Sequence, residues 1–128
     1  MARDPWAEYE RLAQTDFVGL TTNERRLVAF GALGAELNNG AFDQYFFNKA
    51  GDSVEVAMEA ARLAGVPELV ALLQRAVDLL NVSDPRNRDA RQDRLDDMDD
   101  DSFEDLDEQF QVIEASENLD AAMSRLAD

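Results

Sequence analysis

The chain has 128 residues, contains neither cysteine nor histidine, and carries a formal net charge of −16. Its length fits one domain with a hydrophobic core, and an apolar content of 45% excludes wholesale disorder. The absence of cysteine excludes a disulfide framework, and the negative charge argues against direct contact with nucleic acid or an anionic membrane, which require a basic face.

The negative charge is concentrated near the end of the chain. Residues 1–92 carry 14 acidic and 10 basic residues, whereas residues 93–128 carry 14 acidic and 2 basic residues. The two parts therefore have net charges of −4 and −12. Such a field attracts basic partners over distances that salt screening limits.

Start signals predict the first two helices. Asp4 and Pro5 are typical of an N-cap and a first helical position, so a short helix is expected to about residue 13. Thr21 and Glu24 form a capping-box pattern that predicts a second helix. The apolar residues that follow share one stripe; they are Leu27, Phe30, Leu33 and Leu37.

Residues 36–52, called the elbow below, predict a tight break between helices. The elbow contains four of the nine phenylalanine and tyrosine residues. The helical pattern ends at Gly40, where a residue that tolerates positive φ is expected. Phe42, Tyr45 and Phe46 then share one helical face.

Two further helices are predicted before residue 81. Asp52 and Ser53 are expected to cap a helix over 54–64, with Gly65 just beyond its end. A proline opens the next helix, 67–80, whose apolar residues repeat at helical spacing. We predict that the four helices of residues 1–80 form the core.

The remaining residues, 81–128, predict an acidic helical part. Asp84 and the proline after it form another helix-start signal. Residues 89–101 are nearly all polar, with Leu95 and Met98 as the apolar anchors, so a solvated helix and an ordered loop are both consistent with them.

Two more caps are expected in this part, Ser102 and Asn118. The apolar residues after Ser102 lie on one helical face; they are Phe103, Leu106, Phe110 and Ile113. No stretch alternates like a strand. The sequence therefore predicts an all-α, single compact domain over 1–128, with about six to eight helices. The chain has no apolar signal region or membrane-length apolar run, so we expect a cytoplasmic protein.

The elbow and the residues before it resemble the DMP19 family, whose members carry an acidic residue, Asn-Gly-Gly-Phe, Gln-Tyr-Phe, an Asn and a Gly-Asp pair. The matching residues are Glu36, Asn39, Gly40, Phe42, Gln44, Tyr45, Phe46, Asn48, Gly51 and Asp52. The preceding Leu-Thr-x-x-Glu-Arg pattern is matched by Leu20, Thr21, Glu24 and Arg25. The likeness extends over residues 20–95 and more weakly through the acidic part. Ala41 replaces a second glycine, so a slightly less strained backbone is expected there.

Residues 96–108, called the acidic segment below, are the candidate partner-binding surface. The candidate carboxylates are Asp96, Asp97, Asp99, Asp100, Asp101, Glu104, Asp105, Asp107 and Glu108. In a helix, carboxylates four residues apart are separated by about 6 Å of rise, a distance of the same order as that between successive phosphates along a DNA strand. These residues therefore either imitate phosphates or form a solvated face that only aids solubility.

The family resemblance favours imitation, because the family is named for a member that mimics DNA and binds a transcription regulator. It implies a basic DNA-binding protein as the partner of this chain. The rival prediction is a helical interaction module that binds through an apolar surface or the elbow. The sequence leaves the oligomeric state open, including a homodimer.

The acidic segment also contains a calcium-like pattern. Its residues at positions 1, 3, 5, 9 and 12 of an EF-hand loop are Asp97, Asp99, Asp101, Asp105 and Glu108. Ser102 replaces the glycine of the sharp turn, and Glu104 replaces an apolar residue. Calcium binding over 97–108 is therefore a weaker alternative, and we expect no resident metal.

The polar residues of the elbow have two interpretations. They either line a small pocket or cap helix ends and satisfy buried carbonyls, which is the structural role that we expect; they are Asn39, Gln44, Tyr45 and Asn48. Glu36 and Arg25 are then either an ion pair or unrelated surface charges.

Catalysis has few residues available to it. Without histidine and cysteine, imidazole acid–base chemistry, thiol nucleophiles and the usual zinc ligands are excluded. A carboxylate-only hydrolase remains, but no carboxylate pair lies in an apolar run that would raise its pKa. We predict a non-enzymatic binding protein without a cofactor.

Overall fold

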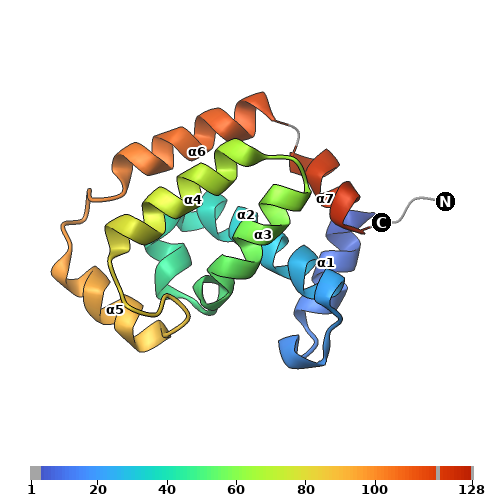
Figure 1. Ribbon diagram of the computed structural model, residues 1–128, viewed down its shortest axis with the longest axis horizontal. Coiled ribbons are helices and arrows are strands. Elements are labelled where there is room, and N and C mark those ends of the chain that lie inside the picture. Colours follow the sequence, from blue (N-terminus) through green and yellow to red (C-terminus); the bar gives the residue numbers. More distant parts are fainter. Residues whose placement is uncertain (1–3, 118, 128) are drawn as a thin grey trace.

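The computed structural model describes residues 4–117 and 119–127, and within them it contains seven α-helices and no strand (Figure 1). The helices are α1 Pro5–Ala13, α2 Thr22–Phe47, α3 Val54–Leu63, α4 Pro67–Leu80, α5 Arg88–Asp97, α6 Glu104–Ser116 and α7 Leu119–Ala127. Two 3-10 helices, η1 Phe17–Gly19 and η2 Lys49–Ser53, connect α1 to α2 and α2 to α3. The predicted all-α domain of about six to eight helices is confirmed.

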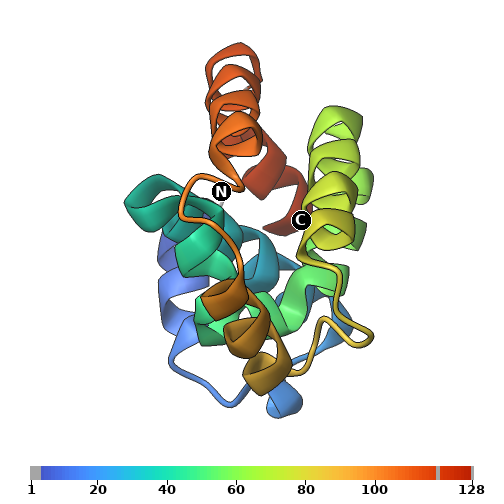
Figure 2. The same ribbon diagram turned by 90° about the vertical axis from the view of Figure 1, so that its left-hand side faces the viewer.

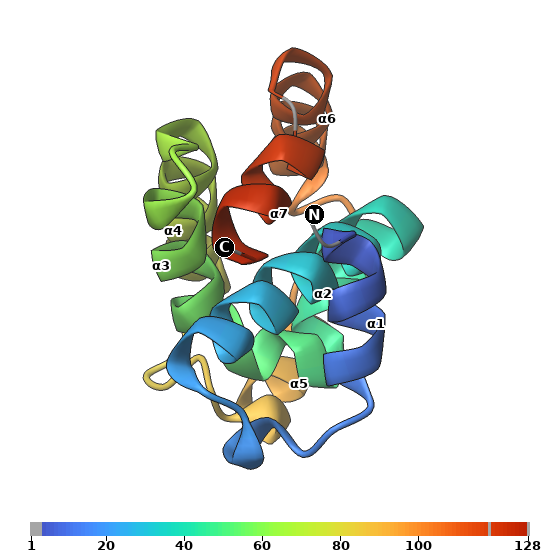
Figure 3. The same cartoon turned by 90° about the vertical axis from the view of Figure 1, so that its right-hand side faces the viewer.

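The long helix α2 lies at the centre of the domain and contacts α1, α3, α5, α6 and α7. Helix α4 packs on α3 and α6, and α7 packs on α1, α2 and α3 (Figure 3). The loop from α5 to α6 lies at the end of the molecule opposite to α1 and α7 (Figure 1), and Figure 2 shows this end from the front. The acidic segment is therefore at one extremity of the domain.

Three helix starts follow the predicted local signals. Asp4 Oδ1 accepts a hydrogen bond from the Trp6 N–H at 3.0 Å, ahead of a proline at the first helical position. Thr21 Oγ1 accepts from the Glu24 N–H at 3.2 Å, and Glu24 Oε1 accepts from the Thr21 N–H at 2.8 Å. Pro67 begins α4. Side-chain oxygens thus satisfy N–H groups that no helical carbonyl can reach.

Helix α3 begins at the predicted residue 54, but the capping bond predicted there and the helix start predicted at Asp84 are wrong. The Ser53 side chain makes no capping hydrogen bond to α3, and the carboxylate of Asp52 binds two arginines. Helix α5 begins at Arg88 after the cap Asn87, whose Oδ1 accepts from the Ala90 N–H at 3.1 Å. The Asp84 carboxylate instead closes a short turn before that cap.

The start of α6 also differs from the prediction. Phe103, and not Ser102, occupies the N-cap position, and its side chain provides no capping bond. Ring packing explains this choice, because Phe103 is buried against Phe42 and Phe46 with centroids 5.9 and 5.6 Å away. The predicted cap at Asn118 lies outside the described residues.

The hydrophobic core extends beyond the first 80 residues. The elbow residues Phe42, Tyr45 and Phe46 are completely buried, as their shared helical face requires. The buried apolar residues after residue 80 are Phe103, Leu106, Phe110, Ile113, Ala122 and Met123. Helix α6 thus holds the acidic segment on the domain through its apolar face.

The backbone breaks inside α2, at the elbow. Gly40 has φ −150°, whereas Ala41 has φ 62° and ψ −163°, a region that is essentially restricted to glycine. The expected relief of strain at Ala41 is therefore wrong, because alanine holds the backbone angles that the second family glycine would adopt freely. Gly40 is needed for another reason: a Cβ there would lie 2.1 Å from the Gln44 Oε1.

Helix α5 is anchored by a buried arginine, besides the predicted Leu95 and Met98, which are partly buried. The Arg91 side chain is 0% exposed. Its guanidinium donates to the carbonyl oxygens of Phe46 at 2.7 Å, Pro85 at 2.5 Å and Asn48 at 3.0 Å, and to Asp52 Oδ1 at 2.6 Å. This arginine connects the end of α2 and the Asp52 turn to α5.

Candidate functional site

The nine candidate carboxylates occupy three consecutive pieces of structure. Two lie at the end of α5, three lie in the loop of residues 98–103, and four lie in the first two turns of α6. Eight of the nine residues are exposed, and Asp107 is half-buried. The fold therefore presents most of the acidic segment on the outside of one end of the domain.

The acidic loop is held in place by short-range turns and one aromatic ring. The N–H groups of Met98, Ser102 and Glu104 donate to carbonyls three residues earlier, at 3.1 to 3.2 Å. The Phe103 ring, 1% exposed, inserts into the core. A buried ring between two groups of acids fixes the backbone that carries them. The carboxylates also lie near the α6 N-terminus, whose dipole favours negative charge.

Asp107 faces the elbow. Its Oδ1 accepts a hydrogen bond from the Phe42 N–H at 3.0 Å, across the break in α2. Partial burial raises the pKa of Asp107 above its ordinary value, and the nearby Glu104 raises it further, although the bond from Phe42 acts in the opposite direction. This carboxylate connects α6 to α2 and is the least available of the nine to a partner.

Asp43 adds a carboxylate that the sequence analysis missed. It lies in the elbow and lines a hollow of about 400 Å³ together with Asp96, Asp99 and Asp100. Partial burial raises the pKa of Asp43, with further contributions from Asp107 and Asp100. Only the fold brings this residue to the acidic segment, because more than fifty residues separate them in the chain.

The acidic segment contains no basic residue of its own. Residues 95–124 contain 12 acidic residues and no lysine or arginine. The ion pairs between described residues lie elsewhere, on Glu8, Asp52, Glu59 and Asp84. The exposed carboxylates of the segment are therefore free to meet a cationic partner.

The structure does not assemble the EF-hand pattern. Asp97 ends α5, whereas Asp105 and Glu108 belong to α6, so the candidate ligands are divided between two helices and the loop that joins them. Within residues 4–117 and 119–127, no three acidic side chains converge in a way that could hold a metal ion. The calcium alternative has no geometric support.

The elbow carboxylates, by contrast, bind groups of their own chain. Glu36 Oε2 accepts from the Gln44 amide at 2.6 Å and from the Asn48 amide at 3.1 Å. Arg25 donates instead to the carbonyls of residues 17 and 18, so the suggested pair between Glu36 and Arg25 is wrong. Asn39 donates weakly to Gln44 at 3.4 Å, and the buried Tyr45 packs in the core.

Asp52 and Gly51 form the second elbow contact. The Asp52 carboxylate binds Arg91 at 2.6 Å and Arg88 at 2.7 Å. Partial burial would raise the pKa of Asp52, but the hydrogen bonds from both arginines outweigh it and hold this pKa below its ordinary value. A Cβ on Gly51 would lie 2.6 Å from the Tyr45 carbonyl oxygen and 3.0 Å from Arg91 Nε. Glycine therefore allows Arg91 to reach this position.

These features define a class: an acidic all-α protein with a fixed, unneutralised acidic surface at one end of its domain. The chain belongs to the DMP19 family, because the family model for DMP19-like proteins matches residues 19–128. The match includes the acidic segment, so the resemblance is confirmed over more of the chain than the elbow suggested. Comparison with curated proteins and with solved structures found no match. In the part of the chain that the structure describes, no helix is both long and apolar enough to span a membrane.

Proposed function

We propose that this protein acts by binding and not by catalysis, as a DNA mimic whose acidic segment competes with DNA for a basic DNA-binding protein such as a transcription regulator. One observation carries the proposal: eight exposed carboxylates lie on a structured segment that contains no lysine or arginine, and Asp43 lies beside them. Membership of the DMP19 family supports it.

The physical basis is the replacement of phosphates by carboxylates. Glu104 and Glu108 lie four residues apart on α6, which gives about 6 Å of rise between them. A basic surface that binds successive phosphates meets charges of the same sign at comparable spacing. Such a complex gains rate and specificity from charge, so its affinity falls as salt rises.

The test is recovery of a DNA-binding protein on the immobilised chain at low and at moderate salt. The first variant combines Asp97→Lys, Asp100→Lys and Asp101→Lys. The matched control combines Glu10→Lys, Glu55→Lys and Asp78→Lys, three exposed acids outside the acidic segment. Both variants change the net charge by the same amount.

We expect the wild type and the control to retain the DNA-binding protein at low salt, and the first variant to lose it. Equal recovery on the two variants would show that only net charge matters. Equal recovery on the first variant and the wild type would remove the acidic segment from the interface. Either result would overturn the proposal.

A further inference from the structure

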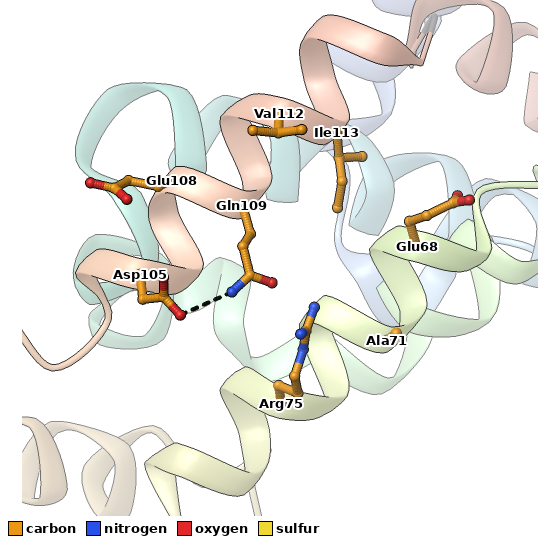
Figure 4. Close-up of a pocket in the computed structure, with 8 residues that line it drawn as sticks. All are labelled: Glu68, Ala71, Arg75, Asp105, Glu108, Gln109, Val112 and Ile113. Carbon is orange, nitrogen blue, oxygen red and sulfur yellow. Dashed lines mark hydrogen bonds between the residues drawn. The ribbon is translucent and has the colours of Figure 1, made fainter.

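A groove lies between α4 and α6, beside the acidic segment. The two helices contact each other and run in opposite directions (Figure 1), and the groove between them has a volume of about 470 Å³ (Figure 4). Ala71 from α4 and Val112 and Ile113 from α6 give it an apolar lining. The Val112 side chain is 67% exposed, among the largest exposures of an apolar side chain in the described residues.

The rim of the groove is predominantly acidic. Glu68 lines it from α4, and Asp105 and Glu108 line it from α6; all three are exposed. Arg75 is the one cation among the described residues that line the groove, and Asp105 accepts a hydrogen bond from Gln109 at 3.0 Å (Figure 4). The groove thus combines an apolar strip with an excess of negative charge.

We propose that this groove binds a basic amphipathic helix of a protein partner. The furrow between two adjacent helices has the shape that a third helix fills by packing its side-chain ridges into it. Apolar side chains of that helix contact Val112 and Ile113. Lysine and arginine side chains that flank the apolar stripe meet Glu68, Asp105 and Glu108. Charge complementarity selects this occupant over an apolar or acidic helix.

The inference rests on the proposed function, because Asp105 and Glu108 belong both to the groove and to the acidic segment. The inference also specifies which element of the partner binds, a basic amphipathic helix. Many DNA-binding proteins read DNA with a helix that carries basic residues, so such a helix is a natural occupant. The apolar contact at Val112 makes a prediction that charge alone does not make.

The experiment uses the full chain and a designed helical peptide as the probe. The peptide contains leucines at i, i+3, i+4 and i+7, flanked by arginines, and a control peptide has the same composition in scrambled order. Fluorescence anisotropy measures the affinity, and amide resonance shifts locate the contact. We expect the amphipathic peptide to bind the chain about tenfold more tightly than the scrambled peptide does, and to shift the amide resonances of Ala71 and Val112.

Two variants separate the apolar contact from charge. Val112→Glu adds a negative charge inside the groove, and Gln111→Glu adds the same charge at an exposed neighbouring position outside it. If the peptide binds in the groove, we expect Val112→Glu to weaken its binding by about fivefold, because the apolar contact is lost. We expect Gln111→Glu to leave the affinity for the peptide unchanged or to increase it slightly. Equal or tighter binding by Val112→Glu would overturn the inference.

Other outcomes are also decisive. Resonance shifts confined to residues outside the groove would overturn the inference. Sedimentation tests whether the chain forms a concentration-dependent dimer. If Val112→Glu dissociates such a dimer and the dimer does not bind the peptide, a second copy of the chain occupies the groove, and the inference is overturned. The competition with DNA is measured separately: if it fails while the peptide binds the groove, the proposed function falls and the groove remains.

Discussion

The elbow and the acidic segment both carry carboxylates, but their surroundings differ. In the elbow, Glu36 binds two amides and Asp52 binds two arginines, all from the same chain. In the acidic segment, eight carboxylates are exposed, and the ion pairs between described residues lie elsewhere. Negative charge thus stabilises the fold where the chain supplies donors. Where the chain supplies none, the carboxylates remain exposed to solvent.

The strongest test of the elbow is removal of its buried cation. Arg91→Ala leaves three carbonyls without their arginine donor and leaves Asp52 with Arg88 as its remaining arginine partner. We expect a loss of about 3–5 kcal/mol in the free energy of unfolding, measured by urea denaturation. Arg88→Ala, which removes a more exposed partner of the same carboxylate, should lower the free energy of unfolding much less. Similar losses for both variants would show that Arg91 is not the anchor.

The next effect concerns the space beside Arg91. Gly51→Ala places a Cβ against the Tyr45 carbonyl oxygen, so we expect a loss of about 1–3 kcal/mol in the same denaturation experiment. Gly19→Ala is the matched control, because no atom lies within 4 Å of the added Cβ, and it should change stability by less than about 0.5 kcal/mol. A neutral Gly51→Ala would contradict the close approach at this turn.

The strain at Ala41 predicts a stabilising substitution. Glycine adopts φ 62° and ψ −163° without a Cβ clash, so Ala41→Gly should raise the free energy of unfolding by about 1 kcal/mol despite the greater freedom of the unfolded chain. Ala35→Gly, at an exposed position in the regular part of α2, should lower it by about 1 kcal/mol. If Ala41→Gly and Ala35→Gly changed the free energy of unfolding in the same direction, the strained backbone at Ala41 would be refuted.

The smallest effect is a pH dependence of the acidic surface. The pKa of Asp43 and that of Asp107 are raised in the folded state, so both groups add stability at low pH that is lost as pH rises through their folded pKa values. Stability should therefore be slightly greater just above pH 3.8 than at neutral pH. The pH dependence from Asp52 has the opposite sign. Its folded-state pKa is lowered, so the stability that it contributes is present above pH 3.8 and is lost as pH falls through the folded pKa.

Asp43→Asn should flatten this dependence. Because Asp43 is exposed, we expect a difference of less than about 0.5 kcal/mol, visible in thermal unfolding at mildly acidic and neutral pH. A steeper profile for Asp43→Asn would contradict the raised pKa.

Local signals predicted much of the fold, and tertiary contacts decided the rest. The caps at Asp4 and Thr21 depend on groups within three residues, so the sequence displays them. Arg91 was not recognised, because a cation in a polar helix is usually solvated and two of its three carbonyl partners lie 43 and 45 residues away. Asp43 was missed because the carboxylates beside it, Asp96, Asp99 and Asp100, are also distant in the chain.

The acidic segment is visible in the sequence, but its geometry was not predictable from it. The inward direction of Asp107 depends on the Phe42 N–H, which is free only because α2 breaks at Ala41. Sequence spacing placed Asp107 among its neighbours without this information. Equally, the groove beside Val112 arises from how α4 and α6 pack, which helical periodicity alone does not describe.

The central claim is that the acidic segment takes the place of DNA on its partner. The most direct measurement titrates the chain into a complex of the captured DNA-binding protein with its fluorescently labelled DNA. We expect the wild type to release the DNA, and the variant that combines Asp97→Lys, Asp100→Lys and Asp101→Lys to leave it bound. A stable ternary complex of chain, partner and DNA would contradict it, because DNA and the acidic segment would then occupy different surfaces.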